Sequence, residues 1–454
     1  MDKKLFSEFD PVSAKAFKQK IQFDLKGADY NEKLVWHSNE GIDVKPFYHK
    51  DDNIKPLSIP GQPENWKIGE EIFILEAQAS AESANEAIEK GAESILFKAE
   101  KPFDVDLLFD KLQYRQFHLY FDLQFLDADF QINLLAQAKQ REFLISINLD
   151  IVGNLALTGN WFTNLEADHK AIDKIISSEN GLETLSVDTS LYQNAGAFIT
   201  QQLAYGLAQV NEYLNGYSDK LANTQLTFKV AIGSNYFFEI AKIRALRLLY
   251  ASLAKEYKLP ETCHIIAFPS KRNKVIYDYN TNLLRTTTEC MSAILGGADT
   301  IINLPYDALY HKTNDFGQRI SRNQLLILKE ESYFDMVSNP AEGSYYIESL
   351  TTQLAEKALD IFKEIEAGGG FLKQLKEGII QKKIKESANK EQEQFDKGTK
   401  ILLGTNKHPN LSDRMEEDLE LYPFVKIKPR KTLLEPIIPK RLAENLEKQR
   451  LENE

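Results

Sequence analysis

The stretch LTFKVAIGSNYFFEIAKIRALRLLY, residues 226–250, has the pattern of one strand followed directly by one helix. Its first part alternates around β-branched and aromatic side chains, which is typical of a pleated strand. Gly233 opens a turn in which Ser234 or Asn235 is placed to cap the helix. Apolar side chains then recur at helical spacing, namely Ile240, Ile243, Leu246, Tyr250 and Leu253. The stretch therefore predicts a β–α unit.

The same unit recurs along the chain from about residue 70. Eight segments have a strand pattern, with helix-like stretches between them: 71–78, 94–98, 117–125, 143–150, 182–190, 226–232, 264–268 and 299–304. Eight strands that alternate with helices favour an α/β fold of the (β/α)₈ TIM-barrel type. An open doubly wound sheet stays an alternative, because a count of strands does not establish closure.

The barrel is predicted to have an extension at each end. Residues 1–60 lack a sustained period and contain four prolines, so we expect a short helix around Ser13–Leu25 and an extended N-terminal arm. The barrel is assigned to residues 61–400. Residues 401–454 are expected to form a linker-like tail, and its end, IIPKRLAENLEKQRLENE, has the pattern of one more amphipathic helix.

Composition excludes several classes of protein. The 454 residues are 43% hydrophobic, which argues against global disorder, and the net charge of −12 argues against a nucleic-acid or anionic-membrane surface. No apolar run reaches the length of a membrane span, and the two cysteines form no CxxC pair. We expect a reduced, cytoplasmic protein without a metal site.

No self-contained catalytic motif is present. The seven histidines form neither HxH nor HExxH, and GxSxG, P-loop and GxGxxG patterns are missing. His118 is interpreted as a hydrogen-bonded core histidine and Cys290 as a packed helix residue. The glycines at 368–370 fit either a phosphate cradle or, in better agreement with their context, a helix end and connector. From the residues alone, the prediction ends at an α/β barrel.

Longer segments carry a family resemblance. AIGSNYFFEIAKIRALRLLY, NLLRTTTECMSAILGGADTIINLPYDA, NPAEGSYYIESLTTQLAEKAL and IEAGGGFLKQLKEGI all resemble segments of the cobalamin-dependent acyl-CoA mutases, in the same order. The resemblance implies a barrel that binds acyl-CoA. It also implies that adenosylcobalamin belongs to a separate flavodoxin-like domain, in which the histidine of a DxHxxG motif ligates cobalt. This sequence contains no DxHxxG.

Four positions depart from the family's substrate-binding pattern. In WKIGEE, Glu71 stands where the family has its catalytic tyrosine, and in SLYQNAGA, Leu191 stands where it has its catalytic histidine. In NLDIVGNLALTGNW, Asn148 and Thr158 occupy the places of a glutamine and an arginine that hold substrate. A threonine cannot bind a carboxylate bidentately as an arginine does. No catalytic, cofactor-binding or metal-binding residue is therefore assigned to this chain.

The resemblance extends to a heterodimeric branch of the family, in which a degenerate small subunit pairs with a catalytic large subunit. It implies that this chain is such a small subunit, in a short form without the cobalamin-binding domain. The large partner would bind adenosylcobalamin and interconvert methylmalonyl-CoA and succinyl-CoA. Two alternatives stay open: an active acyl-CoA mutase barrel that uses a separate cobalamin-binding subunit, and a non-enzymatic CoA-binding regulatory barrel.

The strand alternation also predicts what fills the barrel. The apolar set in 117–125 should pack on the surrounding helices, which places the polar set inside. By the same parity the interior set is Glu76, Lys98, Asp122, Asn148, Asp150, Asp188 and Lys229. We expect Lys98 and Lys229 to pair with carboxylates among Glu76, Asp122, Asp150 and Asp188, because buried charges require partners. The alternative is that both lysines reach solvent at the strand ends.

Overall fold

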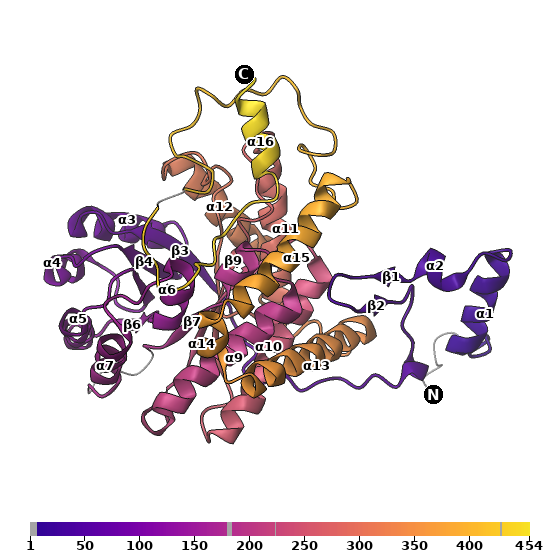
Figure 1. Ribbon diagram of the computed structural model, residues 1–454, viewed down its shortest axis with the longest axis horizontal. Helices are drawn as coiled ribbons and strands as arrows, with labels where there is room; N and C mark the ends of the chain where they lie inside the picture. The colour runs from indigo at the N-terminus through magenta and orange to yellow at the C-terminus, as the bar shows by residue number, and fades with distance from the viewer. Residues whose placement is uncertain (1–6, 179–183, 223, 427–428) are drawn as a thin grey trace.

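Eight parallel strands form the centre of the molecule, and helices surround them (Figure 1). The computed structural model describes residues 7–178, 184–222, 224–426 and 429–454. The strands are β3 (Lys67–Phe73), β4 (Ser94–Ala99), β5 (His118–Leu123), β6 (Leu144–Ile147), β7 (Ser186–Asp188), β8 (Thr227–Ile232), β9 (His264–Pro269) and β10 (Thr300–Ile302). Their order is β6-β5-β4-β3-β10-β9-β8-β7, and a parallel bridge between Leu149 and Leu185 links the two ends of this order.

This arrangement confirms the predicted (β/α)₈ barrel, and the alternative of an open sheet is wrong. Each predicted strand overlaps an observed one, although residues 182–183 of the fifth lie outside the described residues. The first strand was predicted at 71–78, but β3 ends at Phe73. Beyond it, Leu75 is 80% exposed and Glu76 is the residue before helix α3, so the apolar alternation there belongs to a loop.

Helices cover the outside of the barrel. They are α3 (Ala77–Glu89), α4 (Val105–Lys111), α5 (Ala128–Gln140), α6 (Ile151–Thr158), α7 (Leu165–Ile176), α8 (Ser190–Asn194), α9 (Ile199–Tyr217), η2 (Ser218–Lys220), α10 (Tyr236–Glu256), α11 (Thr281–Gly296), α12 (Asp315–Leu326) and the π-helical turn η3 (Ile327–Glu331). The opening stretch forms β8 and α10 as predicted. Asn235 precedes α10, but its side chain makes no capping hydrogen bond.

A further helix, α13 (Tyr345–Ala367), packs against α9 and α10 outside the barrel wall (Figure 1). α10 is therefore buried on two sides. Arg244 is covered by α13, whereas Lys242 is bonded to Gln202 of α9 and Arg247 to the carbonyl groups of Cys263 and Gly297, and all three are at most 1% exposed. Arg244 forms an ion pair of 2.8 Å with Glu348 of α13. An apolar stripe alone did not indicate that the polar face of α10 is also covered.

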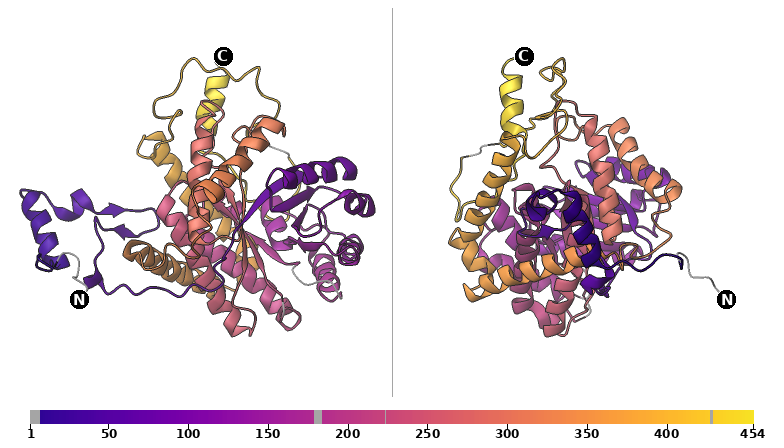
Figure 2. Two further views of the ribbon diagram at one scale, coloured as in Figure 1. Left: turned by 180° about the vertical axis from the view of Figure 1, so that it is seen from behind. Right: turned by 90° about the vertical axis from the view of Figure 1, so that its right-hand side faces the viewer.

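The N-terminal arm projects from the barrel (Figures 1 and 2). It contains α1 (Ala14–Asp24), α2 (Tyr30–Leu34), the antiparallel pair β1 (Trp36–His37) and β2 (Asp43–Val44), and the turn η1 (Lys50–Asp52). The predicted first helix is confirmed. Ser13 caps it by accepting a hydrogen bond of 3.1 Å from the Ala16 amide.

The C-terminal part contains α14 (Phe371–Lys376), α15 (Ile379–Asp396) and α16 (Glu444–Leu451), so the predicted final helix covers only part of its segment. Gly368 ends α13 and Gly370 precedes α14. The Glu212 carboxylate accepts a hydrogen bond from the Leu372 amide at the start of α14. The carboxylate of Glu212 therefore occupies the start of α14, and the glycines at 368–370 form a connector between two helices.

The tail crosses the loops at the carboxyl ends of the barrel strands. The amides of Ile437 and Leu442 donate hydrogen bonds to the carbonyl groups of Ala156 and Arg272, at 2.7 and 2.9 Å. Within the part of the chain that the structure describes, no helix is both long and apolar enough to cross a membrane.

Candidate functional site

A cavity of about 430 Å³ lies at the carboxyl ends of the barrel strands. This is the face on which (β/α)₈ enzymes carry their active sites. Polar side chains from several strands and the loops after them line it, among them Glu71, Lys98, Asp188, Ser190, Asn194, Lys229 and Lys271. Apolar side chains complete the wall, and Leu421 and Pro439 of the tail contribute to it.

The four positions singled out in the sequence do not all reach this cavity. Glu71 and Leu191 line it. Asn148 is 5% exposed, and none of the described residues bonds either atom of its amide group. Thr158 lies at the end of α6, where its hydroxyl donates to the carbonyl groups of Asn154 and Asn160 at 2.8 Å each. The structure therefore brings together two of the four positions, and one of these two is apolar.

Lys229 bridges two acidic side chains inside the barrel. Its Nζ lies 2.6 Å from an oxygen of Asp122 on β5 and 2.8 Å from one of Asp188 on β7. Burial opposes the charge on Lys229, but the two carboxylates outweigh it and hold the Lys229 pKa above its ordinary value. Burial likewise works against the charge of Asp188, yet the nearby Lys229 keeps the Asp188 pKa low. The predicted pairing of Lys229 is confirmed.

Lys98 also has an acidic partner, although not one of those expected. Its Nζ lies 2.9 Å from Glu71 on the neighbouring strand β3. The alternative that both lysines simply reach solvent is wrong. Glu71 is not in the predicted interior set because it has the opposite strand parity to Glu76, and Glu76 lies beyond the end of β3.

Two members of the predicted interior set are wrong. Glu76 is exposed and precedes α3, because β3 has already ended. Asp150 follows the end of β6, where strand alternation no longer applies. Its carboxylate accepts hydrogen bonds from Gln209 and Tyr213 of α9, outside the barrel, at 2.6 and 2.7 Å. Burial raises the Asp150 pKa.

Large side chains fill the barrel beneath the ion pairs. Tyr120 packs with Leu96, Ile266 and Ile302, and its hydroxyl lies 2.9 Å from His264 Nε2. On β3, a Cβ added to Gly69 would lie 2.5 Å from Ile302, so the interior has no space for one. These residues occupy the barrel interior, and none of them belongs to the interior set predicted from strand parity.

His118 lies in the same interior and is a hydrogen-bonded core histidine, as predicted. Its Nε2 is 2.8 Å from the Ser146 hydroxyl. Burial, with a smaller contribution from nearby His264, lowers the His118 pKa to about 4. The imidazole is therefore neutral near pH 7.

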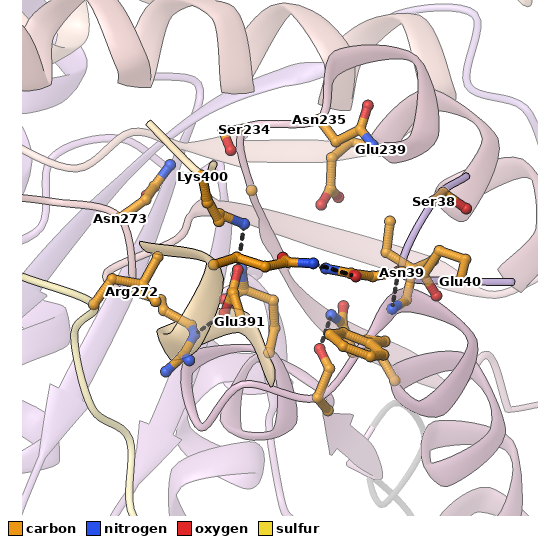
Figure 3. A pocket seen from close by; sticks show the side chains of 18 of the residues that line it. Ser38, Asn39, Glu40, Ser234, Asn235, Glu239, Arg272, Asn273, Glu391 and Lys400 are labelled. Carbon is orange, nitrogen blue, oxygen red and sulfur yellow. Dashed lines mark hydrogen bonds and ion pairs between the residues drawn. The ribbon is translucent and has the colours of Figure 1, made fainter. Parts of the chain in front are cut away.

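A second cavity, of about 510 Å³, lies between the N-terminal hairpin, the loops after β7 and β8, and the end of α15 (Figure 3). Its polar side chains bind one another. Glu391 pairs with Arg272 and Lys400, Asn39 and Gln394 exchange amide hydrogen bonds, and Glu40 accepts from the amides of Ile199 and Thr200. The hydrogen bonds of Asn39 and Glu40 around this cavity hold the base of the arm against the barrel.

Neither cavity presents a recognisable catalytic set. Within the described ranges, no group of three histidine, cysteine, aspartate or glutamate side chains is placed to hold a metal ion. Burial raises the pKa of both thiols, that of Cys263 to about 12, so neither is a thiolate near neutral pH. The sequence interpretation missed Lys271 at the mouth, although its position two residues after a barrel strand is a signal for a functional residue.

Comparison of the sequence with known proteins identifies the family of this chain. A model described as methylmalonyl-CoA mutase matches residues 125–437. The chain is 35% identical to the methylmalonyl-CoA mutase small subunit of Porphyromonas gingivalis, over 90% of this chain and 72% of that protein. It is 29% identical to the methylmalonyl-CoA mutase of Rhizobium meliloti, over 83% of this chain and 61% of that protein.

Among solved structures, the barrel is similar to dihydropteroate synthase from Stenotrophomonas maltophilia. The TM-score is 0.36 and the identity 11%, over 59% of this chain and 94% of that one. This similarity is too weak to bear on function. The match to the family model and the extended similarity to the small subunit are sufficient to assign the family. The chain belongs to the methylmalonyl-CoA mutase family.

Proposed function

We propose that this chain is the non-catalytic small subunit of a heterodimeric methylmalonyl-CoA mutase. Its role is to stabilise a large subunit that interconverts methylmalonyl-CoA and succinyl-CoA. The name of the Porphyromonas gingivalis relative supports the pairing with a larger partner. The four departures at Glu71, Asn148, Thr158 and Leu191 support the loss of catalysis.

The observation that carries the proposal is the state of the barrel mouth. Glu71 is held by Lys98, and Leu191 offers no proton donor or acceptor side chain. Thr158 is bonded within its own turn. A radical mutase must fix its substrate rigidly and exclude water, which requires polar groups aimed at the substrate. Nothing equivalent to a bidentate arginine contact is offered by these positions.

The barrel interior supports the same conclusion. An acyl-CoA that reaches the mouth along the barrel axis needs an open path. Here Lys229 of β8 is bonded to Asp122 of β5, and Tyr120 of β5 to His264 of β9, so these side chains connect strands that are not adjacent and lie across the path. Opening it would separate a buried ion pair, which is costly in free energy.

Members of this family generally depend on adenosylcobalamin. The mouth of this barrel does not fit a corrinoid. A volume of about 430 Å³ lies at the lower end of the range for drug-sized ligands, which is smaller than a corrin ring with its side chains requires. His311 on the rim faces Asp307 at 3.4 Å. We therefore assign the cofactor to the partner subunit.

The proposed division of the chain follows from this role. Residues 1–60 form the arm that contacts the partner, residues 61–400 the degenerate barrel, and residues 401–454 the linker-like tail. Four large apolar side chains within one short segment of the arm are exposed, which supports a contact surface there: Phe9, Val12, Phe17 and Phe23.

Assays of the isolated chain test the proposal. We expect no conversion of methylmalonyl-CoA in the presence of adenosylcobalamin, and no change in the visible spectrum of the cofactor on titration with the protein. A large subunit assayed in parallel is the positive control. Turnover by the purified chain alone would refute the non-catalytic role.

A further inference from the structure

Lys271 differs from the other two lysines that line the mouth cavity near the barrel axis. Lys98 and Lys229 have carboxylate partners within 2.9 Å. Lys271 is exposed at the cavity, and no described residue forms a hydrogen bond or ion pair with its Nζ. Its backbone is held in place, because the Lys271 amide donates to the side chain of Asn194 at 2.9 Å. The backbone of Lys271 is therefore held in place, while its side-chain amine is not bonded to a described residue.

The surroundings of Lys271 disfavour its charged form. Desolvation lowers the Lys271 pKa, and the positive charges of Lys98 and Lys229 lower it further, while Glu71 opposes them in part. A lysine that lines a cavity beside other cations is a better nucleophile near neutral pH, because more of it is uncharged.

The cavity walls beside this amine suit an acyl chain. Leu157, Leu191, Phe268 and Leu304 supply apolar surface. Lys98 and Lys229 line the same cavity together with their acidic partners Glu71 and Asp188, so the wall beside the amine also has charged groups of both signs. The volume of about 430 Å³ lies within the range of small-ligand sites.

We propose that the mouth cavity is a modification site, in which Lys271 is acylated by thioesters of short dicarboxylic acids. The uncharged Nζ attacks the thioester carbonyl carbon, an N–C bond forms and the C–S bond breaks. The thiol leaves with the proton that the amine gives up, and the product is an amide on Lys271. The choice of a dicarboxylic acyl group rests on the proposed function, which places this chain beside methylmalonyl-CoA and succinyl-CoA.

The test is labelling of the isolated chain with succinyl-CoA and with the smaller S-succinyl-N-acetylcysteamine. Site occupancy is measured by mass spectrometry of digested protein over time. The exposed Lys139 and Lys255 serve as references in the same digest. At pH 7.5 we expect Lys271 to react roughly fivefold or more faster than either, and this advantage to shrink near pH 10.5, where all the amines are uncharged.

Two variants separate reactivity from mere accessibility. Lys271→Arg should remove the labelled peptide and leave labelling of Lys255 unchanged. Lys98→Met removes one neighbouring cation and frees Glu71, so labelling of Lys271 at pH 7.5 should slow toward the reference rate and recover at higher pH. Labelling of Lys271 at the reference rate, or with the pH profile of Lys255, would overturn the inference. Turnover by the isolated chain would instead contradict the proposed function and leave the labelling result standing.

Discussion

Replacing Lys229 by methionine is expected to lower the free energy of unfolding by about 3–5 kcal/mol. The change leaves the carboxylates of Asp122 and Asp188 inside the barrel without the cation that lies 2.6 and 2.8 Å from them. An uncompensated buried charge costs far more than the loss of an exposed ion pair. Chemical denaturation at pH 7, followed by circular dichroism, measures the difference.

The matched control for this experiment is Lys170→Met. Lys170 pairs with Glu166 on α7, but both side chains are more than three-quarters exposed, so the expected change is below about 0.5 kcal/mol. The double variant Lys229→Met, Asp122→Asn should be more stable than the sum of the two single changes predicts. A Lys229→Met protein as stable as the wild type would contradict the ion-paired interior.

This effect should depend on pH with a defined sign. The pKa of Asp188 is lowered in the folded protein, so its stabilising contribution is present above the unfolded pKa of about 3.9 and is lost as the pH falls through the folded pKa. The stability difference between the wild type and Lys229→Met should therefore be complete near pH 7. It should decrease below pH 4, where the carboxylates become neutral.

Removal of residues 1–28, the outer part of the N-terminal arm, is expected to abolish assembly with the large subunit. Phe23, Phe9 and Val12 of the arm are 78%, 68% and 60% exposed in the isolated chain. Obligate interfaces commonly bury more than about 2,000 Å² in total, and large apolar side chains supply much of their stability. A chain lacking residues 1–28 should elute apart from a co-expressed partner in size-exclusion chromatography.

This truncation ends before the hairpin that fastens the arm to the barrel. Glu40, which accepts hydrogen bonds at the start of α9, and the buried Ile42 both remain. The point variant Phe23→Asp should weaken assembly in the full chain. Leu75→Asp, which changes a side chain that is 80% exposed on the barrel, is the comparison. Unaltered co-elution of the truncated chain would show that residues 1–28 are not the contact.

The fold was predictable because local signals repeat. Each barrel strand is covered by helices, so its outward side chains are apolar and its helix follows within a short loop, as in β8 and α10. Closure was not predictable by counting, since it depends on pairing between the first and last strands of the barrel, for example between Lys67 of β3 and Thr300 of β10.

The side chains that point into the barrel were predictable only for residues within the strands. Parity placed Asp122 and Lys229 correctly, because both lie well within β5 and β8. It failed for Glu76 and Asp150, which follow the ends of β3 and β6. Beyond a strand end the side-chain direction is set by the turn, which has no period of two. The covered polar face of α10 was missed because tertiary packing by α13 leaves no local pattern.

The most direct test of the central claim is the activity of the assembled complex when this chain's mouth is altered. Glu71→Gln, Lys98→Gln removes both charges at the place where catalytic members hold a tyrosine. The paired change leaves no lone carboxylate or ammonium behind. We expect kcat/KM for methylmalonyl-CoA with adenosylcobalamin to stay within about twofold of the wild-type complex, since the proposed function places the reacting atoms in the large subunit. Loss of a group that takes part in proton transfer typically costs about 10²-fold or more, and a decrease of that size in an intact complex would contradict the account.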